Sequence, residues 1–344
     1  MDNMGGLDND EVPIYTAGIT YNLKKGTKSD IEDEEAEYDD IGTVNAIKNA
    51  LEQLNCRVEL FEADTGIFDK LKKTKVDILF NIAEGTRRRG REAQVPAIAN
   101  IFGIPFTGSD ETTLCLSLDK ALTKRFLSTF RIKTPRYQII EEENTRLDNR
   151  LKFPLIVKPN AEGSSKGIWD FAIAENPDEL KSLISRNLSL YRQPLLVEEY
   201  IRGREFTVAI AGNKQEAVVF PPMEICYKDA GQKFNIYSYN VKKNYQKYVR
   251  YNCPATIDKS VEDRMKHVAL KIYNILQCRD FSRVDFRLSE EGEIYFIEIN
   301  PLPGLAPGYS DFPMITGFCG MSYNDTVKMI LNSALKRYNM KPIP

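Results

Sequence analysis

Two segments near the C-terminal end, residues 281–288 and 293–300, alternate β-branched or aromatic residues with polar ones on either side of a Glu-Glu-Gly turn. This pattern predicts two paired strands joined by a tight turn. Asp285 lies on the first strand, and Glu298 and Asn300 lie two apart on the second. Because side chains alternate between faces with a period of two, Glu298 and Asn300 point the same way. The paired strand can bring Asp285 onto that face.

These oxygen-bearing side chains have two explanations. A solvated face is the ordinary reason for carboxylates on a strand pair. Here residues 294–299 carry apolar side chains on both faces, so we expect a buried hairpin, in which unpaired carboxylates are costly. Mg²⁺ prefers such ligands and completes its shell with water and phosphate oxygens. The hairpin therefore predicts a Mg²⁺ site that serves a nucleotide.

Composition excludes several classes of protein. The chain has 344 residues, enough for two or three domains. Its net charge of -2 argues against a nucleic-acid-binding protein, and no apolar run approaches the ~20 residues that span a bilayer. Six cysteines without a CxxC pair, and no signal peptide, predict reduced thiols in the cytoplasm. His267 is the single histidine, which disfavours a Ser-His-Asp mechanism.

Strand and helix patterns alternate through residues 12–112, which predicts an N-terminal α/β domain with a mostly parallel sheet. The polar residues 1–11 are expected to form a disordered leader. Two further regions are expected at 113–204 and 205–344. Within the last, residues 227–251 show no clear period, and a segment of that length is typical of a lid or binding loop.

The N-terminal domain contains an acidic run and two candidate ligand residues. We interpret the acidic residues 30–40 as a solvated loop that leads into a helix at 35–54, whose first turn favours negative charge. Glu84 and Arg91 follow a strand expected at 76–81. Ligands of open α/β sheets bind at the carboxyl ends of strands, so both residues are candidates for the substrate side. A merely structural loop is an equal alternative.

Two later strands end in residues suited to a nucleotide. Lys158 lies on a buried-type strand that leads into the small-residue turn at 160–167, whose N–H groups can approach phosphate closely. An ordinary hairpin is the alternative. The strand at 195–201 carries Glu198 and Glu199, which point to opposite sides. One of them can bind an adenine amino group, and strand-end solvation is the alternative.

In their order and approximate spacing these features resemble the ATP-grasp enzymes, and most of all the D-alanine–D-alanine ligase branch. The resemblance covers about residues 76–335. It implies an α/β (α+β) fold in which the N-terminal parallel domain precedes two ATP-grasp subdomains, at 113–204 and 205–344, that clamp ATP. The residues that carry the resemblance are Lys120, the strand and loop from Lys158 to Gly167, the segment from Glu198 to Glu205, Arg283, Asp285, Glu298 and Asn300.

The resemblance implies ATP and Mg²⁺ as cofactors, with two metal ions as the family norm and Mn²⁺ as the alternative ion. Lys120 and Lys158 are implied to hold the ATP phosphates beneath a flexible loop that contains Ser164 and Ser165. The implied metal ligands are Asp285, Glu298 and Asn300. The implied adenosine contacts are Glu198, Glu199, Tyr200, Ile201 and Glu205, and the implied catalytic residues are Arg283, Ser164 and Lys242.

The implied reaction joins a carboxylate to an amine. The carboxylate attacks the γ-phosphate of ATP to give an acyl phosphate, which the amine then attacks to form an amide. Positioning and electrostatic stabilisation of the transferring phosphoryl group supply most of the acceleration. The implied partners are small amino-acid or carboxylate substrates, and a homodimer is a family expectation.

The N-terminal substrate segments depart from the ligase pattern. The family's first strand is followed by a segment whose Glu contacts the first amino acid, and residues 18–25 contain no matching acid. The family's His-Gly pair is replaced by residues 83–85, Ala-Glu-Gly. These differences put two D-alanine substrates in doubt.

The C-terminal substrate residues depart as well. Gly304 and Ser310 are the candidate contacts there, but Ser310 aligns with the family's serine only if one residue is inserted. Asp311 then replaces an apolar neighbour. The lid cation is Lys242 or Lys243, and its aromatic partner is a nearby tyrosine.

Three functions stay open at this point. The first is an amino-acid or peptide ligase of the D-alanine–D-alanine ligase type. The second is a ligase of specialised metabolism that joins an amino acid to a different carboxylate. The third is a nucleotide-binding regulator without turnover, against which the intact set of Arg283, Asp285, Glu298 and Asn300 argues.

Overall fold

The computed structural model describes residues 14–26, 32–163, 166–168, 172–228 and 233–344. The predicted leader therefore lies outside the described residues. The N-terminal region forms a three-stranded parallel sheet of order β2-β1-β3, which confirms the predicted parallel α/β arrangement. Its elements are β1 (Tyr15–Tyr21), α1 (Ile41–Gln53), β2 (Cys56–Glu62), α2 (Ile67–Lys73), β3 (Ile78–Asn81) and α3 (Gln94–Phe102).

The central region carries a four-stranded antiparallel sheet of order β4-β7-β5-β6. Asn176 and Pro177 begin its helix as their sequence predicts, because the Asn176 side chain accepts a hydrogen bond from the Glu179 N–H at 3.0 Å. The elements are α4 (Glu111–Leu118), α5 (Lys120–Ser128), β4 (Tyr137–Ile140), β5 (Leu155–Pro159), β6 (Ile173–Ala174), α6 (Pro177–Tyr191) and β7 (Leu195–Glu199).

The C-terminal region is built on a larger antiparallel sheet of order β11-β10-β8-β12-β13, with β9 paired to β8. Its strands are β8 (Gly203–Ala211), β9 (Val218–Val219), β10 (Met223–Tyr227), β11 (Val249–Asn252), β12 (Phe281–Ser289) and β13 (Ile294–Asn300). Its helices are α7 (Tyr239–Lys243), α8 (Tyr245–Tyr248), α9 (Lys259–Ile275), α10 (Asp311–Phe318) and α11 (Tyr323–Arg337).

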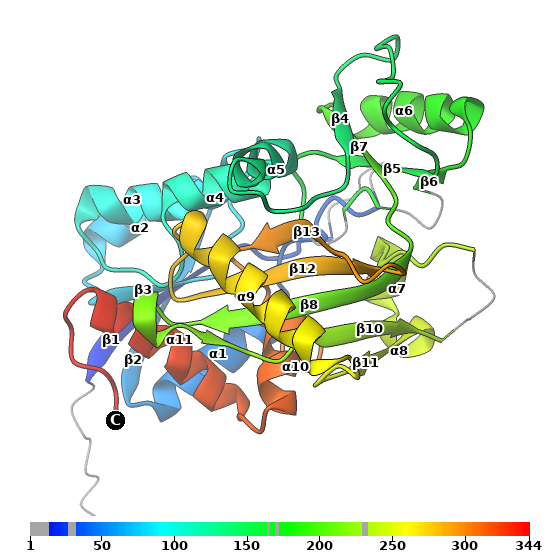
Figure 1. Cartoon of the computed structure of the whole chain (residues 1–344). Helices are drawn as coiled ribbons and strands as arrows, with labels where there is room; N and C mark the ends of the chain where they lie inside the picture. The colour runs from blue at the N-terminus through cyan, green and yellow to red at the C-terminus, as the bar shows by residue number, and fades with distance from the viewer. Residues whose placement is uncertain (1–13, 27–31, 164–165, 169–171, 229–232) are drawn as a thin grey trace, which may run out of the picture.

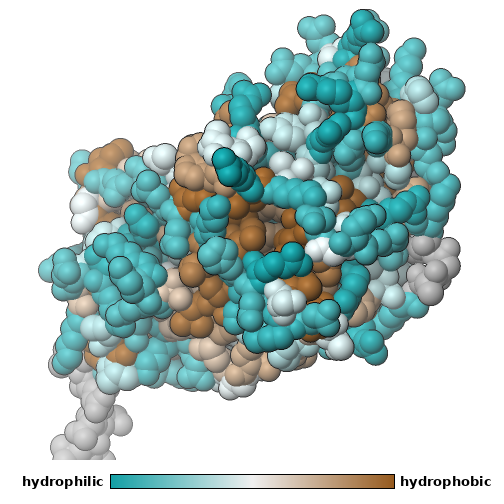
Figure 2. Space-filling view, in the orientation of Figure 1, coloured by the Kyte–Doolittle hydropathy of each residue, from teal (hydrophilic) through white to brown (hydrophobic). Residues whose placement is uncertain are grey.

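Two hydrophobic cores cover the two faces of this larger sheet. On one face lies α9, which crosses the strands of the sheet (Figure 1). Its residues Met265 and Ile272 share a buried core with Phe206 and Phe286. On the other face one continuous core joins β1 and α1 of the N-terminal region to α10 and α11. Figure 2 shows apolar side chains near the centre of the α9 face, whereas the region around α6 is mostly hydrophilic. The shared core fixes the N-terminal sheet against the C-terminal one.

Several elements differ from those expected. The sequence pattern of residues 216–225 predicts a single strand, and this prediction is wrong. Pro221 and Pro222 cannot donate backbone hydrogen bonds, and they separate β9 from β10. The helix expected from residue 35 begins at Ile41, with Asp40 as its N-cap. The lid segment at 227–251 is not without structure, since it contains α7, α8 and most of β11. Helices α4 and α10 were not anticipated.

Each sheet draws its strands almost entirely from one of the three expected regions. The exception is β8, which begins at Gly203 and thus before the expected boundary at 205. The domain limits themselves stay predictions. Within the described residues, no helix is both long and apolar enough to cross a membrane.

Candidate active site

The hairpin of β12 and β13 has the pairing that its sequence predicts. Arg283 lies opposite Asn300, and Asp285 lies opposite Glu298, with a bulge directly after Asp285. The side chains of Asp285 and Glu298 both line a cavity between the central and C-terminal sheets. Two carboxylates are thereby concentrated at one edge of this cavity.

Arg283 is held between two carboxylates. Its Nε and Nη2 atoms each donate to Asp285 at 3.0 Å, and its Nη1 atom donates to Asp311 at 2.9 Å. Burial disfavours the charge of the guanidinium, but Asp285 and Asp311 outweigh burial and raise the pKa of Arg283. Thr207 also donates its hydroxyl to Asp285 at 2.6 Å. The guanidinium is therefore fixed in orientation and permanently charged.

Glu298 is paired with a lysine from α5. Lys120 Nζ lies 3.4 Å from Glu298 Oε2. Burial would raise the pKa of Glu298, but the charges of Lys120, Lys158 and Arg283 outweigh it and lower the pKa to about 2. By contrast, burial raises the pKa of Asp285 despite the neighbouring Arg283. The Glu298 carboxylate is therefore strongly ionised, whereas burial disfavours the ionised form of the Asp285 carboxylate.

The donor set on the hairpin suits a hard cation that is also bound by phosphate. Asp285 and Glu298 offer carboxylate oxygens, and Asn300 offers an amide oxygen that accepts from the Leu302 N–H at 3.0 Å. Over the ranges that the structure describes, no group of three or more His, Cys, Asp or Glu side chains is arranged to hold a metal. A Mg²⁺ ion here would accordingly take most of its shell from water and phosphate.

Glu198 is buried between two lysines. Lys158 Nζ lies 2.6 Å from Glu198 Oε1, and Lys124 Nζ lies 3.1 Å from Glu198 Oε2. Burial raises the pKa of Glu198, but the two lysines outweigh burial and lower it, while burial lowers the pKa of Lys124 to about 8. The Glu199 carboxylate has a different partner and accepts from the Lys152 N–H at 3.0 Å. The expected divergence of the two acids is confirmed.

Sequence reasoning missed Lys124, although its spacing was informative. It lies four residues after Lys120 on α5, and residues four apart share a helix face. Glu205 has further unanticipated partners, because it accepts from Tyr227 Oη at 2.8 Å and from Arg287 Nη1 at 3.1 Å. Alternation along β12 would have placed Arg287 on the face of Asp285.

These residues surround what we call the nucleotide cavity. It lies between the central and C-terminal sheets, and apolar side chains form much of its wall. Lys120 lies at its edge through its contact with Glu298. The lining residues include Pro135, Ile156, Lys158, Ile168, Glu198, Glu199, Tyr200, Ile201, Glu205, Ile236, Lys242, Arg283, Asp285, Arg287, Ile297 and Glu298.

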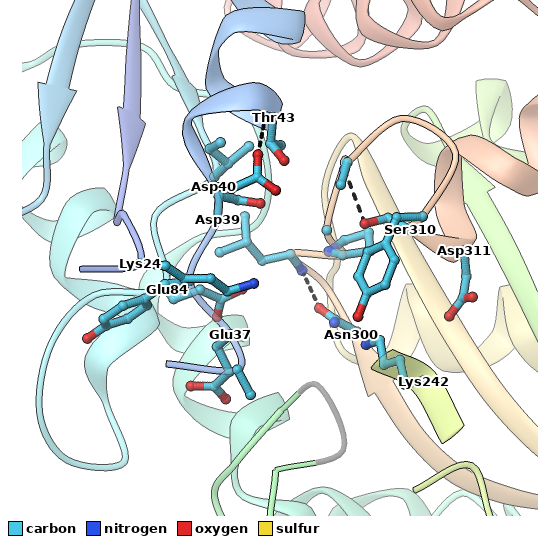
Figure 3. A pocket seen from close by; sticks show the side chains of 18 of the residues that line it. Lys24, Glu37, Asp39, Asp40, Thr43, Glu84, Lys242, Asn300, Ser310 and Asp311 are labelled. Atoms are coloured by element: carbon cyan, nitrogen blue, oxygen red, sulfur yellow. Dashed lines mark hydrogen bonds between the residues drawn. The ribbon is translucent and has the colours of Figure 1, made fainter. Parts of the chain in front are cut away.

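A second cavity, which we call the substrate cavity, encloses about 480 Å³. Figure 3 shows Lys24, Asp39 and Glu84 on its N-terminal side, with Ser310 and Asp311 opposite. Arg283 and Lys242 line both cavities. The two cavities therefore meet at a pair of cationic side chains.

The residues predicted for the substrate side are divided by the structure. Glu84 and Gly304 line the substrate cavity, and burial followed by the charges of Glu92 and Glu37 raises the pKa of Glu84. A Cβ added at Gly304 would lie 2.9 Å from Ser310 Oγ, so a larger residue there would force the Ser310 side chain to shift. Ser310 Oγ also lines the cavity and accepts from the Ala306 N–H at 3.1 Å.

Arg91 is placed elsewhere. It lines neither cavity, and its guanidinium binds Glu37, Glu162 and the Ala161 carbonyl. The expected substrate contact is thus replaced by a buried structural one. Ser164 and Ser165, predicted in the loop over the phosphates, lie outside the described residues.

Two antiparallel sheets that enclose a cavity lined by lysines and carboxylates define an ATP-grasp fold. A crystal structure of D-alanine–D-alanine ligase from Bacillus anthracis complexed with ATP matches with a TM-score of 0.74 and 22% identity, and covers 94% of this chain and 99% of that one. VanG D-Ala:D-Ser ligase from Enterococcus faecalis matches with a TM-score of 0.71 and 21% identity, and covers 93% and 99%. At these identities the likeness establishes the fold alone.

Sequence similarity establishes the family. The family model described as D-ala D-ala ligase C-terminus matches residues 126–332. D-alanine–D-alanine ligase of Aquifex aeolicus is 33% identical over 292 residues, which are 84% of this chain and 93% of the relative. An uncharacterized protein, y4sG of Sinorhizobium fredii, is 30% identical over 303 residues, which are 86% and 88%. The chain belongs to the D-alanine–D-alanine ligase C-terminus family of ATP-grasp C–N ligases, as its sequence motifs indicate.

Proposed function

We propose that the protein is an ATP- and Mg²⁺-dependent carboxylate–amine ligase that forms an amide through an acyl phosphate. The observation that carries the proposal is the shared wall of the two cavities, at Arg283 and Lys242. A phosphoryl group transferred from ATP to a substrate carboxylate has to pass between these cavities, and two cationic side chains at the junction would stabilise its charge.

The nucleotide cavity offers a residue for each part of ATP. In the proposed arrangement Lys120 and Lys158 bind phosphate oxygens, with Ser164 and Ser165 in the loop above them. The side chains and backbone at residues 198–201 meet adenine, and Glu205 meets the ribose. Asp285, Glu298 and Asn300 hold Mg²⁺, which would neutralise charge on the phosphates.

The chain's own residues position the reacting groups in the substrate cavity. Arg283 orients the substrate carboxylate toward the γ-phosphorus and balances the negative charge of the acyl phosphate that forms as ADP leaves. The acceptor amine, once deprotonated, attacks the acyl carbon, and phosphate leaves. Lys242, half-buried at the junction, neutralises the phosphate oxygens during both steps. No covalent protein intermediate is needed.

The names of the relatives suggest amino-acid substrates, and Glu84 on the N-terminal wall suits the ammonium of the first one. Asp311 favours a second candidate, a ligase that joins an amino acid to a partner other than D-alanine. It is 2% exposed, and its Oδ1 atom has no hydrogen-bond partner among the described residues. A carboxylate there repels the carboxylate of an incoming amino acid. We place the reaction in the cytoplasm, and a homodimer stays a prediction.

Phosphate release from ATP and Mg²⁺ should be measured across a panel of D- and L-amino acids and other carboxylates, with and without hydroxylamine. We expect at least one substrate to stimulate release and to yield a hydroxamate. An absence of stimulation by D-alanine would remove the D-alanyl-D-alanine version. ATP binding without turnover on any substrate would favour the regulator.

A further inference from the structure

We propose that Asp33 and Glu37 are positioning residues that hold the backbone N–H groups of Gly167 and Gly163, two described residues of the phosphate loop (residues 160–167). Both acids belong to the acidic segment (residues 32–40), which was expected to be solvated. The inference rests on the proposed function, in which this loop covers the ATP phosphates.

Glu37 joins three parts of the molecule. Its carboxylate accepts from the Gly163 N–H and from two nitrogens of Arg91, with Nε at 3.1 Å from Oε2. The Glu37 side chain is 4% exposed and the Arg91 side chain 7% exposed, so this ion pair is buried. Arg91 in turn donates to the Ala161 carbonyl at 2.9 Å. At the start of the loop, Glu37 therefore binds the Gly163 N–H, and its ion-pair partner Arg91 binds the Ala161 carbonyl.

Asp33 holds the other end of the loop. It is fully buried, and its Oδ2 atom accepts from the Gly167 N–H at 2.7 Å. Tyr191 at the end of α6 donates its hydroxyl to the same carboxylate at 3.1 Å. Gly167 has φ of +77°, and a Cβ there would lie 2.3 Å from Pro159 Cγ. The N–H that Asp33 binds is therefore presented by a turn that only glycine can make.

The same part of the loop also contacts Lys120, which is proposed to bind phosphate. The Glu162 carbonyl, adjacent to Gly163, accepts from Lys120 Nζ. Glu37 also lines the substrate cavity. Glu37 therefore lines the substrate cavity and also contacts the loop that the proposed function assigns to ATP, so binding of substrate and binding of ATP should reinforce each other.

Carboxylate-to-amide substitution keeps the shape of each side chain and removes its charge. Hydrogen bonds to a charged group are about twice as strong as neutral ones, so we expect Asp33→Asn and Glu37→Gln each to raise the KM for ATP about tenfold. The kcat at saturating ATP should stay within about twofold in Asp33→Asn, because Asp33 lines neither the nucleotide cavity nor the substrate cavity. For Glu37→Gln, which changes a residue of the substrate cavity, the comparison is of the KM for ATP alone. Saturating amino-acid substrate should lower the apparent Kd for ATP in the wild type and lower it less in Glu37→Gln.

The test compares these variants in the full chain with Glu34→Gln, which neutralises an exposed acid of the same segment. ATP titrations of phosphate release give KM and kcat, and the Kd values of ATP and adenosine are measured separately. Loss of affinity for ATP with unchanged affinity for adenosine supports a role at the phosphates. Tyr191→Phe, which removes one donor to Asp33, should act in the same direction and serves if Asp33→Asn does not fold.

The inference is overturned if the KM for ATP in Asp33→Asn and Glu37→Gln equals that in Glu34→Gln. It is also overturned if adenosine affinity falls as much as ATP affinity, because the acids would then only support the fold. If the wild type neither binds nor consumes ATP, the proposed function itself fails, which is a separate result.

Discussion

Lys242 and Lys243 are adjacent on α7 but differ in what they contact. Lys242 is half-buried and lines both cavities, whereas Lys243 is exposed and lines the substrate cavity alone, with Nζ 5.6 Å from the ring centre of Tyr239. If the ammonium at the junction stabilises the transferring phosphoryl group, Lys242→Met should lower kcat/KM by about 100- to 1,000-fold. That corresponds to about 2.7–4 kcal/mol, the range for loss of one preorganised donor. Lys243→Met should change it by about threefold or less.

Thermal stability provides an independent check, because Lys242→Met is expected to lower activity without lowering the melting temperature. Burial, and then the charge of Arg283, lowers the pKa of Lys242. A lysine whose pKa is lower in the folded state destabilises that state wherever it is charged, and this cost disappears as pH rises toward the ordinary lysine value of about 10.5. Lys242→Met should therefore melt no lower than the wild type at pH 7. Its advantage should shrink on the alkaline side.

The assay is steady-state phosphate release with the most active substrate of the panel, together with differential scanning calorimetry at pH 7 and pH 10. Lys242→Arg should extend activity to higher pH, since a guanidinium stays protonated there. Equal losses in Lys242→Met and Lys243→Met would refute the reasoning. So would a melting temperature of Lys242→Met that falls in step with its activity.

Three further outcomes follow from the site. Arg91→Lys cannot span the atoms that the guanidinium reaches, so unfolding free energy should fall by about 3 kcal/mol, or about 4 °C in melting temperature if the chain unfolds as one unit. Calorimetry beside Arg88→Lys, an exposed position, checks this. Glu298→Gln should lower phosphate release at least about 100-fold while adenosine still binds, and an unaffected rate would contradict the metal assignment. Burial raises the pKa of Asp39 to about 7, so its ionised form costs stability at pH 8. Asp39→Asn should therefore melt higher than the wild type at pH 8, and this gain should vanish near pH 4.

The hairpin of β12 and β13 could be predicted in detail because its information is local. A period of two and a short turn are enough to determine which residues share a face and which lie opposite each other. Asp285 and Glu298 face each other for that reason. The same local pattern predicts strands near residues 137–140 and at 155–159, which agree with β4 and β5.

Residues that depend on distant partners could not be predicted in this way. A run of acids is usually solvated, and nothing near Asp33 in the sequence indicates that Gly167 and Tyr191 will bury it. Arg91 likewise pairs with Glu37, 54 residues away. Such contacts arise only when whole regions pack together, so local pattern and spacing contain no signal for them.

The two cavities differ in the kind of backbone that builds them. Strands β5, β7, β8, β12 and β13 supply the charged residues of the nucleotide cavity except Lys242 of α7, whereas connections after β1, β3 and β13 supply most of the substrate cavity. Connections tolerate substitution and insertion far better than paired strands do. Natural divergence, or laboratory selection, can therefore change which substrates bind in the substrate cavity while the nucleotide cavity stays the same.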